Sequence, residues 1–158
     1  MILPTNFKND IQGKDTNLFP IVRFGSVSDN NIYKTHIYSV GTYTCSSVWV
    51  VGNVVTIPTL LNIPSLKESI DIEKRNYKIS NVSLQFSNAE YNGVRFSDKI
   101  TQDTGSFINT ECRIFWASPS GNRLHPEDHD AAGTPANAAF QIFYGQVRKY
   151  EHDDEKVR

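Results

Sequence analysis

Hydrophobic and polar residues alternate with a period of two in several short stretches, most clearly between residues 60 and 88. Ile70 and Ile72 alternate with serine and acidic residues, and the run at 82–86 alternates hydrophobic residues with serine and glutamine. A period of two places apolar side chains on one face of a strand and polar side chains on the other. The pattern therefore predicts a pair of sheet strands, packed on one face and solvated on the other, with a charged corner at 73–76.

Further strands are predicted on both sides of this pair. Two β-branched runs flank Gly52-Asn53, which predicts a hairpin over 48–57 because glycine supplies the positive φ of a tight turn. Gly145 is predicted to form a bulge near the end of a late strand, and 98–106 is expected to be a loop or one helical turn. The other expected strands lie at 19–24, 32–40, 42–45, 112–116 and 140–144. This succession predicts an all-β fold, an antiparallel barrel or sandwich with long loops.

The two ends of the chain differ from its middle. Residues 1–18 are dominated by polar residues and predict an extended N-terminal arm, which leaves 19–158 as the β-domain. A long loop is expected at 118–138, and such loops in compact domains are usually functional or mobile. The charged stretch 151–158 is interpreted as a hairpin tip without its return strand, so the chain is expected to be the front part of a longer protein.

Composition excludes several classes of function. The formal net charge of the 158 residues is −1, which lacks the basic excess expected of a nucleic-acid-binding protein. No stretch has the pattern of a secretory signal or the length of a membrane span, so we expect a soluble protein made in a cytosol. Cys45 and Cys112 are too far apart for a CxxC motif. Both are interpreted as buried thiols, with a disulfide as the alternative.

The cluster with the most catalytic character is His125-Pro126-Glu127-Asp128-His129-Asp130. Histidine and carboxylate side chains are metal ligands, so a metallohydrolase using His125, Asp128 and His129 is one alternative. The order of residues does not match the HExxH motif, however, and a solvated acidic loop is the preferred interpretation. No nucleophile elbow, phosphate-binding loop or dinucleotide fingerprint is present. We therefore assign no catalytic, cofactor-binding or metal-binding residue, and expect a protein that is not an enzyme.

Charged residues around the central strands, and a few residues of the later part of the chain, are candidates for contacts between subunits. Exposed aromatic residues would instead suit a carbohydrate-binding β-sandwich, which is the main alternative; its candidates are Trp49, Trp116, Tyr91 and Tyr144. The candidate interface residues are Lys67, Glu68, Glu73, Lys74, Arg75, Trp116, His125 and His129.

Three stretches carry a resemblance to a known family. The segments LLNIPSLKESIDIEKRNYKISNVSLQFSN, CRIFWASPS and QIFYGQVRKYEHDDEKVR together resemble the front domain of tail hub or tail-tip structural proteins of long-tailed bacteriophages, which also occur in gene transfer agents. The resemblance covers most of the chain from about Ile32 onward.

The resemblance implies a β-barrel of the tail-tube kind that assembles with copies of itself into a ring, as a trimer in hubs and a hexamer in other tail rings. It implies a location in the virion tail tip, after synthesis in the bacterial cytoplasm. The implied partners are distal-tail, tube and tip or fibre proteins, with transient contact with the passing genome DNA. Some relatives bind an iron–sulfur cluster through four cysteines in a later domain, whereas this chain has two cysteines and no cofactor is expected.

Overall fold

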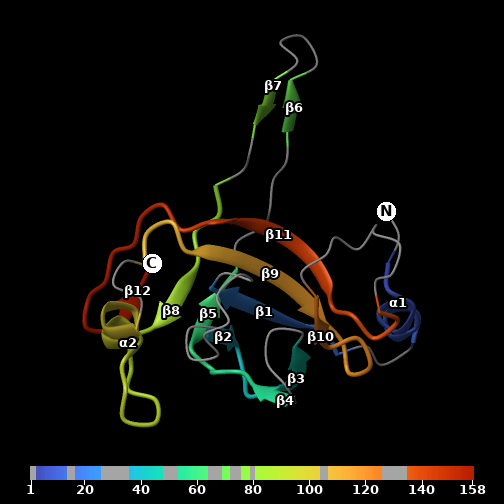
Figure 1. Cartoon of the computed structure of the whole chain (residues 1–158), viewed down its shortest axis with the longest axis horizontal. Helices are drawn as coiled ribbons and strands as arrows, with labels where there is room; N and C mark the ends of the chain where they lie inside the picture. The colour runs from blue at the N-terminus through green and yellow to red at the C-terminus, as the bar shows by residue number, and fades with distance from the viewer. Residues whose placement is uncertain are drawn as a thin grey trace.

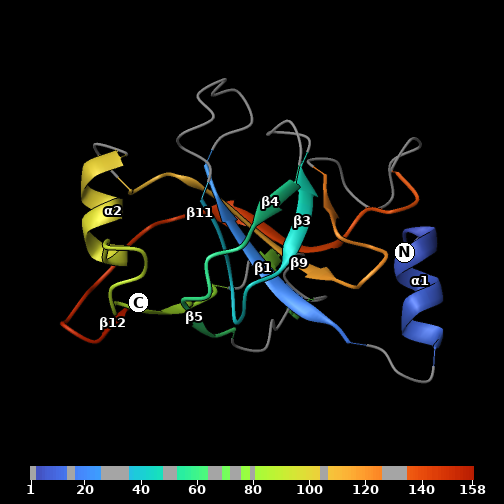
Figure 2. The same ribbon diagram turned by 90° about the horizontal axis from the view of Figure 1, so that it is seen from below.

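The computed structural model describes residues 3–13, 17–25, 36–47, 53–63, 69–71, 76–78, 81–103, 107–125 and 135–158. Most of the elements are strands, and the two short helices lie at opposite ends of the molecule (Figures 1 and 2). The helices are α1 (Thr5–Gln12) and α2 (Phe96–Asp103). The strands are β1 (Phe19–Phe24), β2 (His36–Ser39), β3 (Thr44–Ser47), β4 (Asn53–Val55), β5 (Leu60–Asn62), β6 (Ser69–Asp71), β7 (Asn76–Lys78), β8 (Gln85–Ser87), β9 (Glu111–Ala117), β10 (Arg123–Leu124), β11 (Phe140–Gln146) and β12 (Lys156–Val157). The all-β class expected from the sequence is confirmed.

The described strands form four sheets, and none of these sheets closes on itself. The largest is antiparallel and has the order β11-β9-β1-β2. Two three-stranded sheets have the orders β10-β3-β4 and β12-β8-β5, and β10 is parallel to β3. The fourth is the two-stranded ribbon β6-β7, which stands away from the other sheets (Figure 1). The pairing pattern is that of open sheets in layers.

The two central strands of the four-stranded sheet, β1 and β9, are buried on both faces, because each face packs against a separate hydrophobic cluster. Val22, Phe24 and Ile114 belong to one cluster, and their neighbours Ile21 and Phe115 belong to the other. Adjacent residues of a strand point to opposite faces, so β1 and β9 are hydrophobic at consecutive positions instead of alternating. The first cluster includes residues of β5, β8, β12 and α2, and the second includes residues of β3 and β10.

The strand pair predicted between residues 70 and 86 is wrong in its pairing. Strand β6 pairs with β7, with Ile70 opposite Tyr77, whereas β8 pairs with β5 and β12 in another sheet. The entropy lost on closing a loop grows with its length, which favours the nearer partner for β6. Alternation located β6, but residues 82–84 of the second predicted strand lie before β8, and β7 begins at Asn76 of the predicted charged corner. Alternation also did not specify which strands pair.

Two local predictions within strands are also corrected. Asn53 is the first residue of β4 instead of a turn residue, and Val54 pairs with Cys45 of β3. The other predicted arm of that hairpin, 48–51, lies outside the described residues. The irregularity in β11 lies between Gln141 and Phe143, whereas Gly145 is in regular register with Cys112.

The N-terminal segment contains a helix where the sequence was interpreted as an extended arm. Phe7 of α1 is buried, and its ring stacks on Phe140 with a centroid distance of 5.7 Å. The Asn6 amide donates a hydrogen bond of 2.9 Å to the carbonyl of Ala136. Phe7 therefore anchors a segment that is otherwise polar, because a buried phenylalanine removes a large apolar area from water, and hydrogen bonds from Ser120 to Asp10 add to this contact.

Two further segments differ from expectation. Residues 98–106, expected to be a loop or one helical turn, begin within the eight-residue helix α2. The C-terminal segment contains a short return strand, since β12 pairs with β8 and the Arg158 amide donates a 2.8 Å hydrogen bond to the carbonyl of Glu151. The side chain of Asn88 joins these segments. Its amide nitrogen donates to the Asp153 carbonyl at 2.8 Å and its oxygen accepts from the Ser97 amide at 3.0 Å.

Candidate functional site

Most of the interface residues expected from the sequence lie outside the described part of the chain: Lys67, Glu68, Glu73, Lys74, Arg75 and His129. Trp116 lies in β9, half-buried, in register with Pro20 on one side and Phe140 on the other. His125 follows β10 and is half-buried. Among the described residues, no group of three or more His, Cys, Asp or Glu side chains is placed to hold a metal ion. The described helices are all too short or too polar to cross a bilayer.

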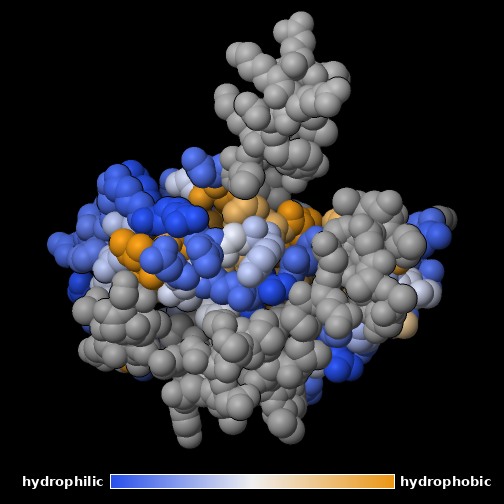
Figure 3. Space-filling model, turned by 45° about the horizontal axis from the view of Figure 1, so that its top comes forward, coloured by the Kyte–Doolittle hydropathy of each residue, from blue (hydrophilic) through white to orange (hydrophobic). Residues whose placement is uncertain are grey.

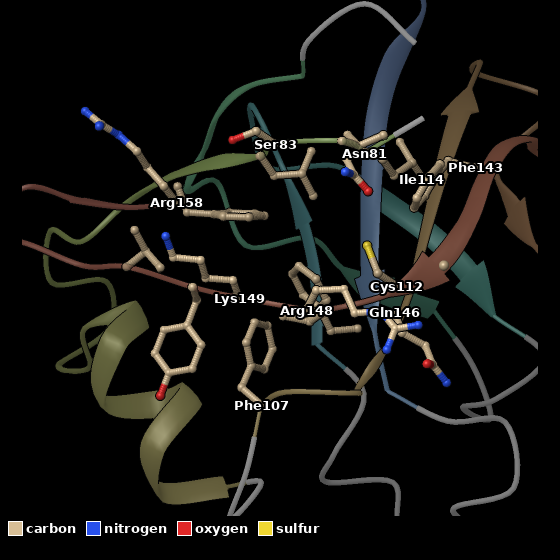
Figure 4. A pocket seen from close by; sticks show the side chains of 18 of the residues that line it. Asn81, Ser83, Phe107, Cys112, Ile114, Phe143, Gln146, Arg148, Lys149 and Arg158 are labelled. Carbon is tan, nitrogen blue, oxygen red and sulfur yellow. The ribbon is translucent and has the colours of Figure 1, made fainter. Parts of the chain in front are cut away.

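A groove of about 830 Å³ opens beside the second half of β11. Its size is that of typical ligand or peptide sites. Residues 81–84 lie on one side of the groove, and residues 146–151 lie on the other (Figure 4). The groove reaches one of the two hydrophobic clusters of the central sheet, because no described element closes the gap between these two segments.

The floor of the groove is built from aromatic residues of the core. Phe86 of β8 stacks on Phe96 of α2 with a centroid distance of 4.6 Å, and Phe24 of β1 meets Phe107 edge to face at 4.9 Å. All four residues are buried and line the groove. Because interlocked rings have few alternative rotamers, the floor is a preformed apolar surface.

The rim of the groove carries more positive than negative charge. Arg148, Lys149 and Arg158 line it, together with one acidic residue, Glu151, so these four side chains give +3 − 1 = +2. Lys149 Nζ lies 2.5 Å from Glu151 Oε1. This hydrogen bond and charge attraction raise the pKa of Lys149 and lower the pKa of Glu151. The rim therefore favours an occupant with negative charge next to its apolar part.

Strand β11 contributes both backbone and side chains to the groove. It is at the edge of its sheet, and β9 is its partner in the ladder among the described strands. Gly145 allows the ring of Phe143 to fold over the strand, since a Cβ at this position would lie 2.8 Å from that ring. Tyr144 is 58% exposed, and Figure 3 shows hydrophobic residues reaching the surface among hydrophilic ones. The outer edge of β11 thus carries aromatic side chains, and no other described strand pairs with it.

A separate polar cluster links three strands of the central sheet. Glu111 Oε1 of β9 accepts from Arg23 Nη1 at 3.2 Å and from Arg113 Nε at 2.6 Å. Arg113 Nη1 donates to the side-chain oxygen of Gln141 at 2.9 Å, and its guanidinium lies 4.4 Å from the centre of the Tyr144 ring. Burial lowers the pKa of Arg23 to about 10, against the opposing effect of Glu111. Arg23 thus stays protonated at neutral pH, and the cluster acts as a structural clamp.

Neither the groove nor this clamp was predicted from the sequence. Arg23 and Glu111 are 88 positions apart, and the two sides of the groove are separated by more than 60. The only signal in the sequence was the succession of basic residues after the β11 pattern, at Arg148 and Lys149. Arginine and lysine side chains are usually exposed to solvent, so this succession alone does not predict a binding groove.

Comparisons of the chain with protein-family models, with curated proteins and with solved structures found no match.

Proposed function

We propose that this chain is a structural subunit of a bacteriophage tail tip, which assembles with copies of itself into a ring. The resemblance of three sequence segments to tail hub proteins supports a location in the phage tail tip. The observation that carries the proposal is the ribbon β6-β7, which stands away from the other sheets (Figure 1). A two-stranded hairpin alone is marginally stable in water, so a projecting ribbon is typical of a segment that is completed by a neighbouring subunit.

The remaining architecture suits such a role. A sheet whose central strands are buried on both faces forms a stiff body. The subunit has two different surfaces that neighbours can use: the ribbon β6-β7 and the outer edge of β11. Two different faces make a heterologous contact, which generates a ring when the rotation between subunits closes. The tail-tube type of β-barrel belongs to the same proposal, as does a trimer in preference to a hexamer.

In this role the subunit joins the tail tube to the host-facing tip and lines the channel through which the genome passes. Its neighbours are then copies of itself and distal-tail, tube and tip or fibre proteins. No chemical step is assigned to it. The work of the protein is geometric: rigid sheets set the angle between neighbours, and that angle sets the number of subunits in the ring.

The test is assembly of the purified chain, followed by light scattering and electron microscopy. We expect rings at high concentration, with threefold symmetry for a hub and sixfold symmetry for a distal-tail or tube ring. Replacement of residues 69–78 by a short Gly-Ser linker should abolish the rings and change the melting temperature by less than about 2 °C, because β6 and β7 form a sheet of their own.

The carbohydrate-binding alternative gives the opposite result. A chain that stays monomeric, and that binds a sugar specifically until Trp116→Ala or Trp49→Ala removes binding, would overturn the assembly proposal. Trp116 is half-buried within β9, so the fold of its variant needs to be verified by thermal unfolding before a loss of sugar binding is interpreted.

A further inference from the structure

We infer that the groove beside β11 receives strand β6 of a second copy of this chain, so that β6 is added to the edge of the four-stranded sheet. This inference rests on the proposed self-assembly and specifies the contact that produces it. The ribbon of each subunit then occupies the groove of the next, in a head-to-tail arrangement.

The first argument is the hydrogen-bonding capacity of the two strands. Among the described strands, β11 pairs with β9 only, and β6 pairs with β7 only. Each therefore has an outer edge with no ladder partner among the described strands, and such an edge can pair with another strand. Addition of a strand to such an edge is a common mode of recognition, in which the backbone supplies affinity and side-chain pockets supply specificity.

The second argument is the match between the sequence of β6 and the lining of the groove. Strand β6 reads Ser69-Ile70-Asp71 and is followed in the sequence by Ile72-Glu73, so that the two isoleucines alternate with Ser69, Asp71 and Glu73. A strand with this alternation presents apolar residues on one face and acidic residues on the other. The groove offers an aromatic floor and a rim with a charge of +2 from its four ionic side chains.

The third argument is the position of the ribbon on its own subunit. The ribbon stands clear of its own sheets, so β6 is accessible to a neighbour (Figure 1). The groove of the same subunit lies alongside β11, where a strand from outside meets both the open edge and the rim cations. Because the donor and acceptor surfaces differ, the contact is heterologous, and repetition of it produces a closed ring or a filament.

A charge swap between the two surfaces tests the contact. Asp71→Arg places a cation against the cationic rim, and Arg148→Asp removes a rim cation and adds an anion opposite β6. We expect each single variant to weaken self-association, measured by analytical ultracentrifugation, by about tenfold or more. The double variant carries the swapped pair in every contact and should recover association to within about threefold of the original chain. Lys8→Glu on the exposed surface of α1 is the matched control and should leave association unchanged.

Site-directed cross-linking gives an independent readout. An equal mixture of Ser69→Cys and Gln146→Cys chains should form a disulfide-linked dimer under mild oxidation, because addition of β6 to β11 brings these backbones within one strand spacing. Ser120→Cys, at an exposed turn, replaces Gln146→Cys in the control mixture and should give no such dimer. The native thiols of Cys45 and Cys112 are buried and do not compete.

The outcomes separate this contact from the proposed function. Rings that persist in both single variants, with no dimer from the Ser69→Cys and Gln146→Cys mixture, would overturn the docking of β6 and leave self-assembly standing. A wild-type chain that is monomeric at every concentration tested would overturn both. If both single variants lose self-association and the folded double variant does not recover it, the proposed pairing of Asp71 with Arg148 is also contradicted.

Discussion

At the scale of single residues, the fold depends on a few side chains whose partners are distant in the sequence. Phe7 holds α1 against β11, and Glu111 connects Arg23 with Arg113. Neither role could be predicted from the sequence, because a lone phenylalanine in a polar segment and a glutamate at the start of a strand are both common at the surface. Burial decides their importance, and burial is a property of the whole fold.

The first prediction concerns Phe7. Phe7→Ala should lower the free energy of unfolding by about 3 kcal/mol, because it removes a buried ring and leaves a cavity against Phe140. Gly121 permits this contact, since a Cβ there would lie 3.0 Å from the Phe7 Cα. Urea denaturation measures the change. Ile11→Ala on the same helix, at a residue 36% exposed, is the control and should cost less than about 1 kcal/mol.

The second prediction concerns the clamp around Glu111. Glu111→Gln keeps the size of the side chain but leaves the charges of Arg23 and Arg113 without their shared anion, which should lower the free energy of unfolding by about 2–3 kcal/mol. Glu151→Gln removes an exposed partner of Lys149 and should leave stability nearly unchanged, because solvent screens this ion pair. If the two substitutions lower the free energy of unfolding equally in urea denaturation, the clamp does not stabilise the fold more than an exposed ion pair does.

At the scale of elements, sequence periodicity located strands well and paired them poorly. The runs around Ile114 and Ile142 were recognised as strands, and both are long strands of the central sheet. The partner of β6 was missed, because alternation specifies which face of a strand is apolar but not which strand lies beside it. The helix α2 was shortened in the prediction for a related reason: its docking depends on Phe96, whose burial is determined by residues of β2 and β8.

The third prediction addresses how α2 and the C-terminal turn are held together. Asn88→Ala should lower the free energy of unfolding by about 1–3 kcal/mol, because the Ser97 amide and the Asp153 carbonyl both lose their partner. The measurement is hydrogen exchange, in which amides of α2 should lose protection more than those of β9. Asn122→Ala, which removes an exposed hydrogen bond of 3.4 Å, should have a negligible effect on both.

At the scale of the whole molecule, one cysteine lies in each of the two hydrophobic layers that cover the central sheet. Cys45 belongs to the hydrophobic cluster on one face and Cys112 to the cluster on the other, and both are free thiols. The sequence-based interpretation of two buried thiols is confirmed. Burial raises the pKa of Cys45 to about 11 and, with a contribution from Glu111, the pKa of Cys112 to about 12.

The fourth prediction follows from these pKa values. Both thiols should resist alkylation by iodoacetamide at pH 8 in the folded protein and react fully in denaturant. In the unfolded chain a thiol ionises near pH 9, whereas the folded chain retains the proton. Stability should therefore be complete below pH 9 and fall as the pH rises from 9 to about 11–12. Replacement of both cysteines by alanine should reduce this loss of stability at alkaline pH. If the pH dependence of stability is unchanged, the loss arises from other titratable groups.

The order of strands in the central sheet also has a consequence for synthesis of the chain. Strand β1 lies between β2 and β9, and Ile21 pairs with Phe115, which is made 94 residues later. At about 5–20 residues per second, β1 waits roughly 5–20 s on the ribosome with one hydrophobic edge open. Cells that produce this protein should accumulate aggregates when translation is slowed between residues 40 and 110, and co-expressed chaperones that shield nascent chains should raise the soluble yield.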